Sequence, residues 1–298
     1  MTALRNWKVA LSISDAPDRS RLGYPDQEIT RVLFSICTAL IRAGAGILYS
    51  GDLRPTGYTF KMFRFLVGAY AGQGMVPFEH IVPEPVLRKL SYDTLYEVLS
   101  ESRGVTTTIF HLGGKTFPVR RSDEGILVGD KRLQRTNITS QRQLSEWLDH
   151  YPVADKSSAY LDARQVVTSM SNARIAIGGK MGILDDPNDK YEGARPGIVE
   201  ESIITLQQRK PLVVLGAFGG ASRDIAIALN LLDKKEEVPR KPQETSYHRA
   251  IDEVRALSSS IPTNIVGSLR AIAKDDRAEA VALSIVEVLN RSRDPSVA

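Results

Sequence analysis

Glycine recurs in turns of this 298-residue chain that follow short apolar runs and precede amphipathic stretches. Glycine lets a backbone approach a phosphate closely, and the free N–H groups of a following helix favour an anion. In open α/β sheets such turns gather at the carboxyl ends of the strands, where ligands bind. The turns therefore predict a phosphate-binding crevice. Its expected lining is Ser14, Asp15, Gly51, Asp52, Arg54, Gly178, Gly179, Lys180, Pro196, Gly197, Glu200, Gly216, Phe218, Gly219 and Gly220.

The turns contain two kinds of group that could hold a phosphate. Lys180 and Arg54 would add positive charge, while backbone N–H groups of glycines would donate hydrogen bonds. Phe218 would either stack on a base or fill the core. The glycines expected to act through their N–H groups are Gly51, Gly179, Gly197, Gly219 and Gly220.

Carboxylates occur at the same places. Asp15 and Asp52 end the first two predicted strands, and Glu200 and Glu201 lie in the first turn of a predicted helix. Asp15, Asp52 and Glu200 could accept hydrogen bonds from sugar hydroxyls, or they could serve turns, caps or the helix dipole. Glu200 or Glu201 could instead stabilise an oxocarbenium-like sugar or activate water. Neighbouring helical residues point about 100° apart, so only one of the two is expected to face the crevice.

Several familiar motifs are absent. Gly113-Gly114-Lys115-Thr116 resembles the end of a P-loop, but Ile109 stands where the first glycine should be. No GxGxxG follows a strand, and no GxSxG nucleophile elbow occurs. Cys37 is the single cysteine, which excludes a disulfide within the chain and a cysteine-based zinc site. The four histidines have no metal-ligand spacing. We therefore expect neither a metal nor a cofactor.

Alternating strands and helices must position these turns. Such an order predicts a Rossmann-like α/β fold with a doubly wound, mostly parallel sheet and helices on both faces. We expect one domain over residues 1–298, with a core at 7–232, an insertion at about 76–153 and a helical extension at 241–298. The strands are expected over Trp7–Ser14, Ile47–Tyr49, Val105–Phe110, Arg174–Ile177 and Pro211–Leu215. The helices are expected over about 26–43, 58–70, 91–100, 140–150, 155–172, 196–209 and 225–232.

Composition limits the function classes. The net charge of +4 is mild for this length and fits an anionic small ligand better than nucleic acid. A basic stretch, Arg120, Arg121, Lys131, Arg132 and Arg135, is expected to be a solvated loop or hairpin. The amino terminus lacks the apolar core of a signal peptide, and no apolar run is long enough for a membrane helix. The chain is expected to be cytoplasmic and without a membrane contact.

The turns together resemble those of the SMF/DprA–LOG superfamily, usually called SLOG, in its bacterial sensor clusters. The resemblance covers residues 9–220, about two thirds of the chain. The residues that carry it are Ser12-Ile13-Ser14-Asp15-Ala16-Pro17-Asp18, Ser50-Gly51-Asp52-Leu53-Arg54, Gly178-Gly179-Lys180, Arg195-Pro196-Gly197-Ile198-Val199-Glu200-Glu201 and Gly216-Ala217-Phe218-Gly219-Gly220.

The resemblance implies a Rossmann-like fold and a nucleotide-derived ligand, such as ADP-ribose or a cyclic relative. Bacterial relatives occur in antiviral defence systems beside TIR or sirtuin NADases, which implies such a partner here. The phosphoribohydrolase branch, related to lysine-decarboxylase-like proteins, carries PGGxGTxxE. Here Pro196-Gly197-Ile198-Val199-Glu200 lacks the second glycine and the Gly-Thr step. This departure favours binding over hydrolysis.

Three hypotheses follow. The first is a sensor domain that binds a nucleotide or ADP-ribose derivative and acts through a homo-oligomer or a partner, since no effector segment is evident. The second is an N-glycosidic hydrolase of a nucleotide or NAD-like substrate. The third, single-stranded DNA binding, is the least favoured, because aromatic residues make up only 7% of the chain and none is interleaved with a basic run.

Overall fold

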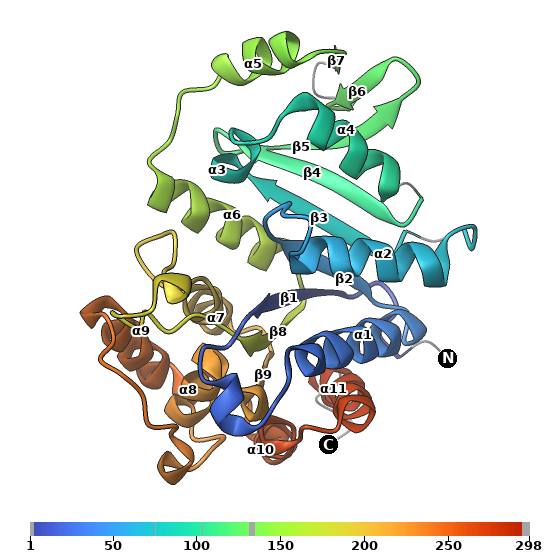
Figure 1. Cartoon of the computed structure of the whole chain (residues 1–298). Helices are drawn as coiled ribbons and strands as arrows, with labels where there is room; N and C mark the ends of the chain where they lie inside the picture. The colour runs from blue at the N-terminus through green and yellow to red at the C-terminus, as the bar shows by residue number, and fades with distance from the viewer. Residues whose placement is uncertain (1–2, 75, 103, 131–134, 294–298) are drawn as a thin grey trace. The chain divides into compact units, whose positions relative to one another are not determined.

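The computed structural model describes residues 3–74, 76–102, 104–130 and 135–293, which divide into two compact units (Figure 1). Unit 1 comprises Met1–Ile47 and Arg164–Ala298, and unit 2 comprises Leu48–Ala163. Two elements run across the boundaries, β2 (Gly46–Ser50) and α6 (Lys156–Met170). The predicted insertion at 76–153 lies wholly inside unit 2. The extent of a single domain over 1–298 stays a prediction.

Unit 1 is built on three parallel strands, β1 (Lys8–Ser14), β8 (Ala173–Gly178) and β9 (Leu212–Leu215). β8 pairs with both neighbours, and the register places Ser14 opposite Gly178 and Ile177 opposite Leu215. Every residue of β8 and β9 is buried. Burial on both faces explains why these strands read as continuous apolar runs. The carboxyl ends of the three strands therefore lie at one edge.

Helices pack around these strands. α7 contacts all three strands, α8 contacts β8 and β9, and α10 contacts β9. α11 lies along α1, where Arg31 pairs with Glu279 at 3.0 Å, so the helical extension belongs to unit 1. The helices of unit 1 are α1 (Asp26–Arg42), α7 (Gly197–Gln207), α8 (Gly220–Ala228), α9 (Thr245–Ala256), α10 (Val266–Lys274) and α11 (Ala278–Arg293). The short 3-10 turns are η1 (Arg19–Leu22), η2 (Pro187–Asp189), η3 (Gly216–Phe218), η4 (Lys234–Glu236), η5 (Ser258–Ser260) and η6 (Thr263–Ile265).

Unit 2 contains one parallel pair followed by an antiparallel ladder. β3 and β4 are parallel, and β4, β5, β6 and β7 then pair in antiparallel order. Its strands are β3 (Phe78–Pro83), β4 (Thr106–Leu112), β5 (Lys115–Ser122), β6 (Gly125–Val128) and β7 (Thr136–Ile138). Its helices are α2 (Tyr58–Tyr70), α3 (Glu84–Leu87), α4 (Tyr92–Glu101) and α5 (Gln141–Asp149). The side chains of Ser91 and Ser140 each accept a hydrogen bond from the backbone N–H three residues later and so cap α4 and α5.

The structure confirms the Rossmann-like α/β fold and the predicted strands β1, β8 and β9 of unit 1. The helix predicted over 225–232 has other bounds, because α8 begins at Gly220 and ends at Ala228, and residues 229–232 form turns and bends. Gly113 and Gly114, both at positive φ, form the turn between β4 and β5, which explains the P-loop-like letters without a P-loop. Arg120 and Arg121 lie in the expected hairpin, on β5. Lys131 and Arg132 lie outside the described residues.

The core of each unit follows from apolar periodicity. One face of α1 is fully buried, and Cys37 lies on it. Burial raises the pKa of the Cys37 thiol to about 12. Within the described residues, no helix has the length and apolarity that a bilayer crossing requires.

Candidate functional site

Three turns of unit 1 meet at the carboxyl ends of its strands. The Gly179 N–H donates to the carbonyl of Ser14 at 3.2 Å, and the Ala221 N–H donates to the carbonyl of Gly179 at 3.0 Å. The Gly220 N–H donates to Oδ1 of Asp18 at 2.6 Å. The first and third of these bonds join residues more than 150 positions apart in the sequence. The predicted gathering of the turns after β1, β8 and β9 is therefore present.

The glycines of these turns are needed for close packing. A Cβ at Gly178 would lie 2.2 Å from the Ser14 carbonyl oxygen, and one at Gly220 would lie 2.6 Å from the Gly179 oxygen. A Cβ at Gly219 would lie 2.5 Å from Asp18 Oδ1. All three glycines have φ between +65° and +80°, a region that L side chains rarely adopt. Close packing alone therefore explains why these three positions are glycine.

Three of the glycines predicted to donate their N–H groups to a phosphate donate instead to other parts of the chain. The N–H groups of Gly179 and Gly220 donate to Ser14 and Asp18, and that of Gly219 donates to the carbonyl of Gly216 at 3.2 Å. These three N–H groups therefore hold the turns together in this structure. Gly197 is the remaining glycine of unit 1 that we predicted to donate its N–H to a phosphate. Its N–H takes no part in these contacts between the turns.

Asp18 is a buried carboxylate that the sequence motif contained without an assigned role. Its side chain accepts from Gly220, whereas its second oxygen has no hydrogen-bond partner in the described structure. Burial raises the pKa of Asp18, against the lowering effect of the Gly220 bond. Asp18 therefore links the loop after β1 to the start of α8.

The amino end of α7 combines open backbone with a buried cation. Pro196 is its N-cap, and no side chain caps the helix. The Arg164 guanidinium lies beside this end, because a Cβ at Gly197 would be 3.0 Å from Arg164 Nη2. Arg164 also pairs with Glu200 in the first turn, and both side chains are largely buried. Arg164 was not predicted, since a single arginine in the apolar pattern of α6 gives no indication of what it faces.

Glu201 belongs to a different network, which is built around the fully buried Arg174. Arg174 on β8 lies 3.2 Å from the Glu201 carboxylate and donates to Ser12, Thr205 and Thr168 at 2.7, 2.9 and 2.7 Å. Ser12 in turn donates to Glu201. Burial lowers the pKa of Arg174, while the Glu201 charge raises it. This arrangement satisfies a buried charge, so Glu201 anchors α7 to the sheet.

Lys180 begins a long folded loop. Its Nζ donates to the carbonyl of Lys190, and the Asp189 carboxylate accepts from the N–H groups of Met181 and Ile183 at 3.0 and 2.8 Å. Burial raises the pKa of Asp189. The loop is further fixed where Glu244 donates its N–H to Gly182 at 2.8 Å. The Lys180 side chain is thus held within this loop, and its role toward a ligand stays a prediction.

The remaining predicted residues of unit 1 differ in exposure. Phe218 is fully buried and packs against Tyr24 at a ring distance of 5.4 Å, so its ring fills the core. Asp15 is exposed and lies 3.7 Å from Arg19. Gly216 is tightly enclosed, since its Cβ would lie 2.6 Å from Leu232.

Gly51, Asp52 and Arg54 lie in unit 2. Asp52 pairs with Arg54, and its carbonyl accepts from Thr59 at the start of α2. A Cβ at Gly51 would overlap the Tyr49 ring at 2.3 Å. The Gly51 carbonyl also accepts from His80 Nε2 at 3.3 Å. The ligand roles of these three residues stay predictions.

The glycine turns lie together at the carboxyl ends of parallel strands, as in other Rossmann-like α/β proteins. The sequence then identifies the family of this protein. The chain belongs to SLOG, because the sequence model of SLOG cluster2 matches residues 3–264. Membership suggests a nucleotide-related function. No curated protein and no solved structure matches the chain. Among the described residues, His, Cys, Asp and Glu form no group of three or more that could hold a metal ion.

Proposed function

We propose that the chain is a sensor that binds a nucleotide or ADP-ribose derivative, with a phosphate seated at the amino end of α7. The observation that carries this proposal is the uncapped helix end at Pro196 and Gly197, with the Arg164 guanidinium beside it. The first N–H groups of a helix lack intrahelical acceptors, and the helix dipole adds positive potential there. A guanidinium adds planar donors suited to phosphate.

Glu200 acts on this site through Arg164. Its carboxylate pairs with the guanidinium from within the first turn of α7, so the cation stays beside the helix end. Asp15 supplies an exposed carboxylate after β1 that can accept hydrogen bonds from a ribose. The ligand is therefore recognised by backbone, one arginine and carboxylates.

Binding without turnover is supported by the state of the two glutamates. Glu200 is paired with Arg164, and Glu201 is held by Arg174 and Ser12. A carboxylate that already pairs with a buried cation would have to break that contact before it could activate water. The altered PGGxGTxxE turn agrees with this. The ligand signal would then pass through a homo-oligomer or a TIR- or sirtuin-type NADase partner in a bacterial defence system.

The test uses titration calorimetry beside thermal melts. ADP-ribose should raise the melting temperature, whereas adenosine, which lacks phosphate, should do much less. Gly197→Leu should reduce the affinity for ADP-ribose at least tenfold, about 1.4 kcal/mol, because the side chain displaces Arg164 and covers the helix end. Gly267→Leu is the matched control, since Gly267 also lies in a first helical turn, on α10, with no atom within 4 Å of its Cβ position.

Two outcomes would contradict the proposal. A folded Gly197→Leu protein with wild-type affinity would remove the α7 turn from the site. Release of a free base by the wild-type chain, lost in Glu200→Gln, would establish the hydrolase hypothesis in its place. Chromatography of ADP-ribose after incubation with the protein distinguishes binding from hydrolysis.

A further inference from the structure

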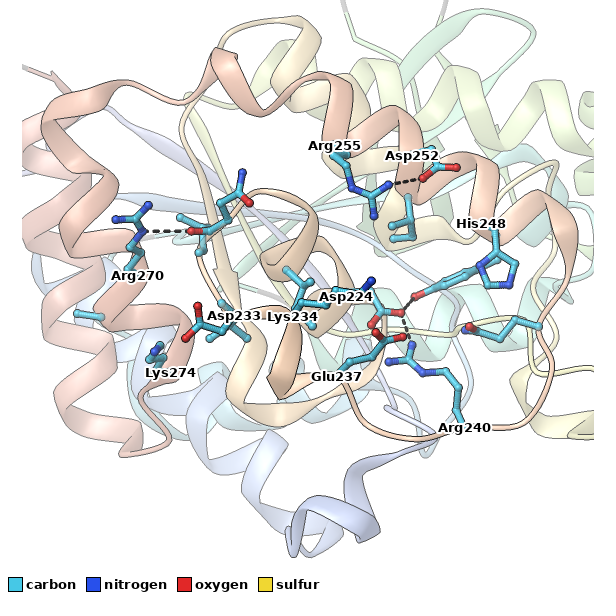
Figure 2. Close-up of a pocket in the computed structure, with 18 residues that line it drawn as sticks. Asp224, Asp233, Lys234, Glu237, Arg240, His248, Asp252, Arg255, Arg270 and Lys274 are labelled. Carbon is cyan, nitrogen blue, oxygen red and sulfur yellow. Dashed lines mark hydrogen bonds and ion pairs between the residues drawn. The ribbon is translucent and has the colours of Figure 1, made fainter.

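A cavity lies in unit 1, and none of the predicted site residues lines it. It has a volume of about 1010 Å³ and is lined by α8, the segment from Asn230 to Gln243, α9 and α10 (Figure 2). Cavities of several hundred to a thousand Å³ are typical of small-molecule sites. The size therefore suits a ligand larger than a single ion.

The floor of this cavity is a buried ion pair. Asp224 accepts from Tyr247 Oη at 2.5 Å and from Arg240 Nη1, and all three side chains are at least nine-tenths buried. Arg240 also donates Nε to the carbonyl of Val238 at 3.0 Å. Its Nη2 is buried with no hydrogen-bond partner in the described structure. The carboxylate of the floor is thus satisfied, while the guanidinium retains a donor.

The rim carries more available donors than acceptors. Arg270 uses only Nε, which donates to the carbonyl of Asn230 at 3.1 Å. The Lys234 carbonyl accepts from the Glu237 N–H at 3.0 Å, whereas its exposed ammonium group has no hydrogen-bond or ion-pair partner among the described residues. Of the rim carboxylates, Asp252 pairs with Arg255, and Asp233 lies 3.4 Å from Lys235 outside the cavity. Donors without an acceptor favour an anion.

The cations lie in different parts of the cavity. Figure 2 shows Arg270 and Lys274 together at the left of the cavity, Arg255 at the top beside Asp252, and Lys234 near the centre. Lys274 also lines the rim, where its Nζ lies 3.4 Å from the Glu236 carboxylate. Glu237 is the remaining carboxylate, and it is exposed to solvent. A ligand that spans the cavity would therefore meet positive charge at more than one place.

We infer that this cavity binds a small molecule with at least two oxyanion groups, phosphates or carboxylates. Arginine matches both groups with paired donors, and lysine adds charge. Apolar side chains of Ile227, Leu231 and Ile251 line the cavity beside these cations and can contact the carbon part of the ligand. This site is separate from the amino end of α7, since no residue lines both.

The experiment is calorimetric titration of the full chain at constant ionic strength, with pyrophosphate and citrate as probes. It is run on wild type and on Gly197→Leu, which blocks the α7 turn. We expect at least one probe to bind Gly197→Leu, and the preferred probe distinguishes a phosphate ligand from a carboxylate one. Arg270→Gln and Lys234→Gln should each weaken this binding at least fivefold.

Lys235→Gln is the matched control, because it removes the same charge from a neighbouring lysine that does not line the cavity. It should change the affinity less than twofold. Lys234, Lys235 and Arg270 are exposed, so we expect these three variants to fold, and thermal melts check this. Failure of both probes to bind Gly197→Leu, or equal losses in Lys234→Gln and Lys235→Gln, would overturn the inference.

Discussion

Two adjacent glutamates in one helical turn meet different cations, and this difference decides what each can do. Glu200 faces Arg164 beside the open end of α7, while Glu201 faces the fully buried Arg174. Breaking a buried pair by removing one partner is costly because the other charge stays buried. The sequence predicts that only one of the two faces the crevice, and the contacts favour Glu200.

Glu201→Gln should therefore act on stability, and Glu200→Gln should act on binding. We expect Glu201→Gln to lower the free energy of unfolding by about 3 kcal/mol, because Arg174 loses its counter-charge. Its affinity for ADP-ribose should stay within twofold of wild type. Glu200→Gln should weaken binding at least fivefold, because Arg164 is no longer held at the helix end. Urea unfolding and calorimetry on both variants check this; the reverse pattern would contradict it.

His80 should make stability depend on pH. It is fully buried among Tyr49, Phe63 and Phe78, and burial lowers its pKa from 6.5 to about 4 against the hydrogen bond to the Gly51 carbonyl. The unfolded chain takes up a proton near pH 6.5, whereas the folded chain resists until about pH 4. Stability is therefore present above pH 6.5 and is lost as the pH falls to 4, by about 3 kcal/mol.

The measurement is urea unfolding of wild type and His80→Phe between pH 7 and 4. The variant keeps an aromatic ring but cannot be protonated, so its stability should fall by about 3 kcal/mol less than that of wild type over this range. His248→Gln, at an exposed histidine, is the control and should follow wild type. Parallel pH curves for wild type and His80→Phe would contradict the assignment.

At the scale of elements, the local sequence pattern predicted individual strands and helices, whereas contacts between distant residues determine the site. The buried runs of β1, β8 and β9 and the face of α1 follow from apolar periodicity. The strands β3, β6 and β7 were not predicted. The segment of β5 was expected only as part of a loop or hairpin, because Pro118, Arg120 and Arg121 break its apolar pattern. Arg174 reads as a polar strand end, yet it is fully buried in β8.

The contacts that join the turns could not be predicted either. Asp18 and Gly220 are 202 positions apart, and nothing local indicates that one caps the other. Arg164 likewise reaches the α7 end from a helix in which its neighbours gave only an amphipathic pattern. Sequence reasoning located the turns and missed the side chains that fix them.

Gly220 tests how far these turns depend on close packing. Gly220→Ala places a Cβ 2.6 Å from the Gly179 oxygen at φ +65°, so we expect a loss of at least 2 kcal/mol in unfolding free energy. Gly267→Ala, in open space on α10, should be neutral or stabilising by up to about 1 kcal/mol. Thermal and urea unfolding measure both. An unchanged stability of Gly220→Ala would mean that the turn can rearrange.

At the scale of the molecule, the last two helices lie beyond the residues that the family model matches. The match ends at residue 264, whereas α10 and α11 follow it and pack within unit 1. α11 lies along α1, and Tyr24 donates to Asp276 at 2.8 Å just before α11 begins. The residues after the matched region therefore complete the core of unit 1.

The two faces of α11 allow a matched test of this role. Ile285 is fully buried, whereas Leu283, two positions earlier on the same helix, is 63% exposed. Ile285→Asp removes a buried side chain and places a charge in the core, so we expect a loss of at least 3 kcal/mol or no folded protein. Leu283→Asp should change stability by less than about 0.5 kcal/mol, because its position is solvated. Circular dichroism with urea titration, beside size-exclusion chromatography, measures both, and equal stability of the two variants would mean that unit 1 folds without α11. If α11 is part of the core, Ile285→Asp must also lose ADP-ribose binding in proportion to its unfolded fraction, since the α7 turn belongs to the same unit.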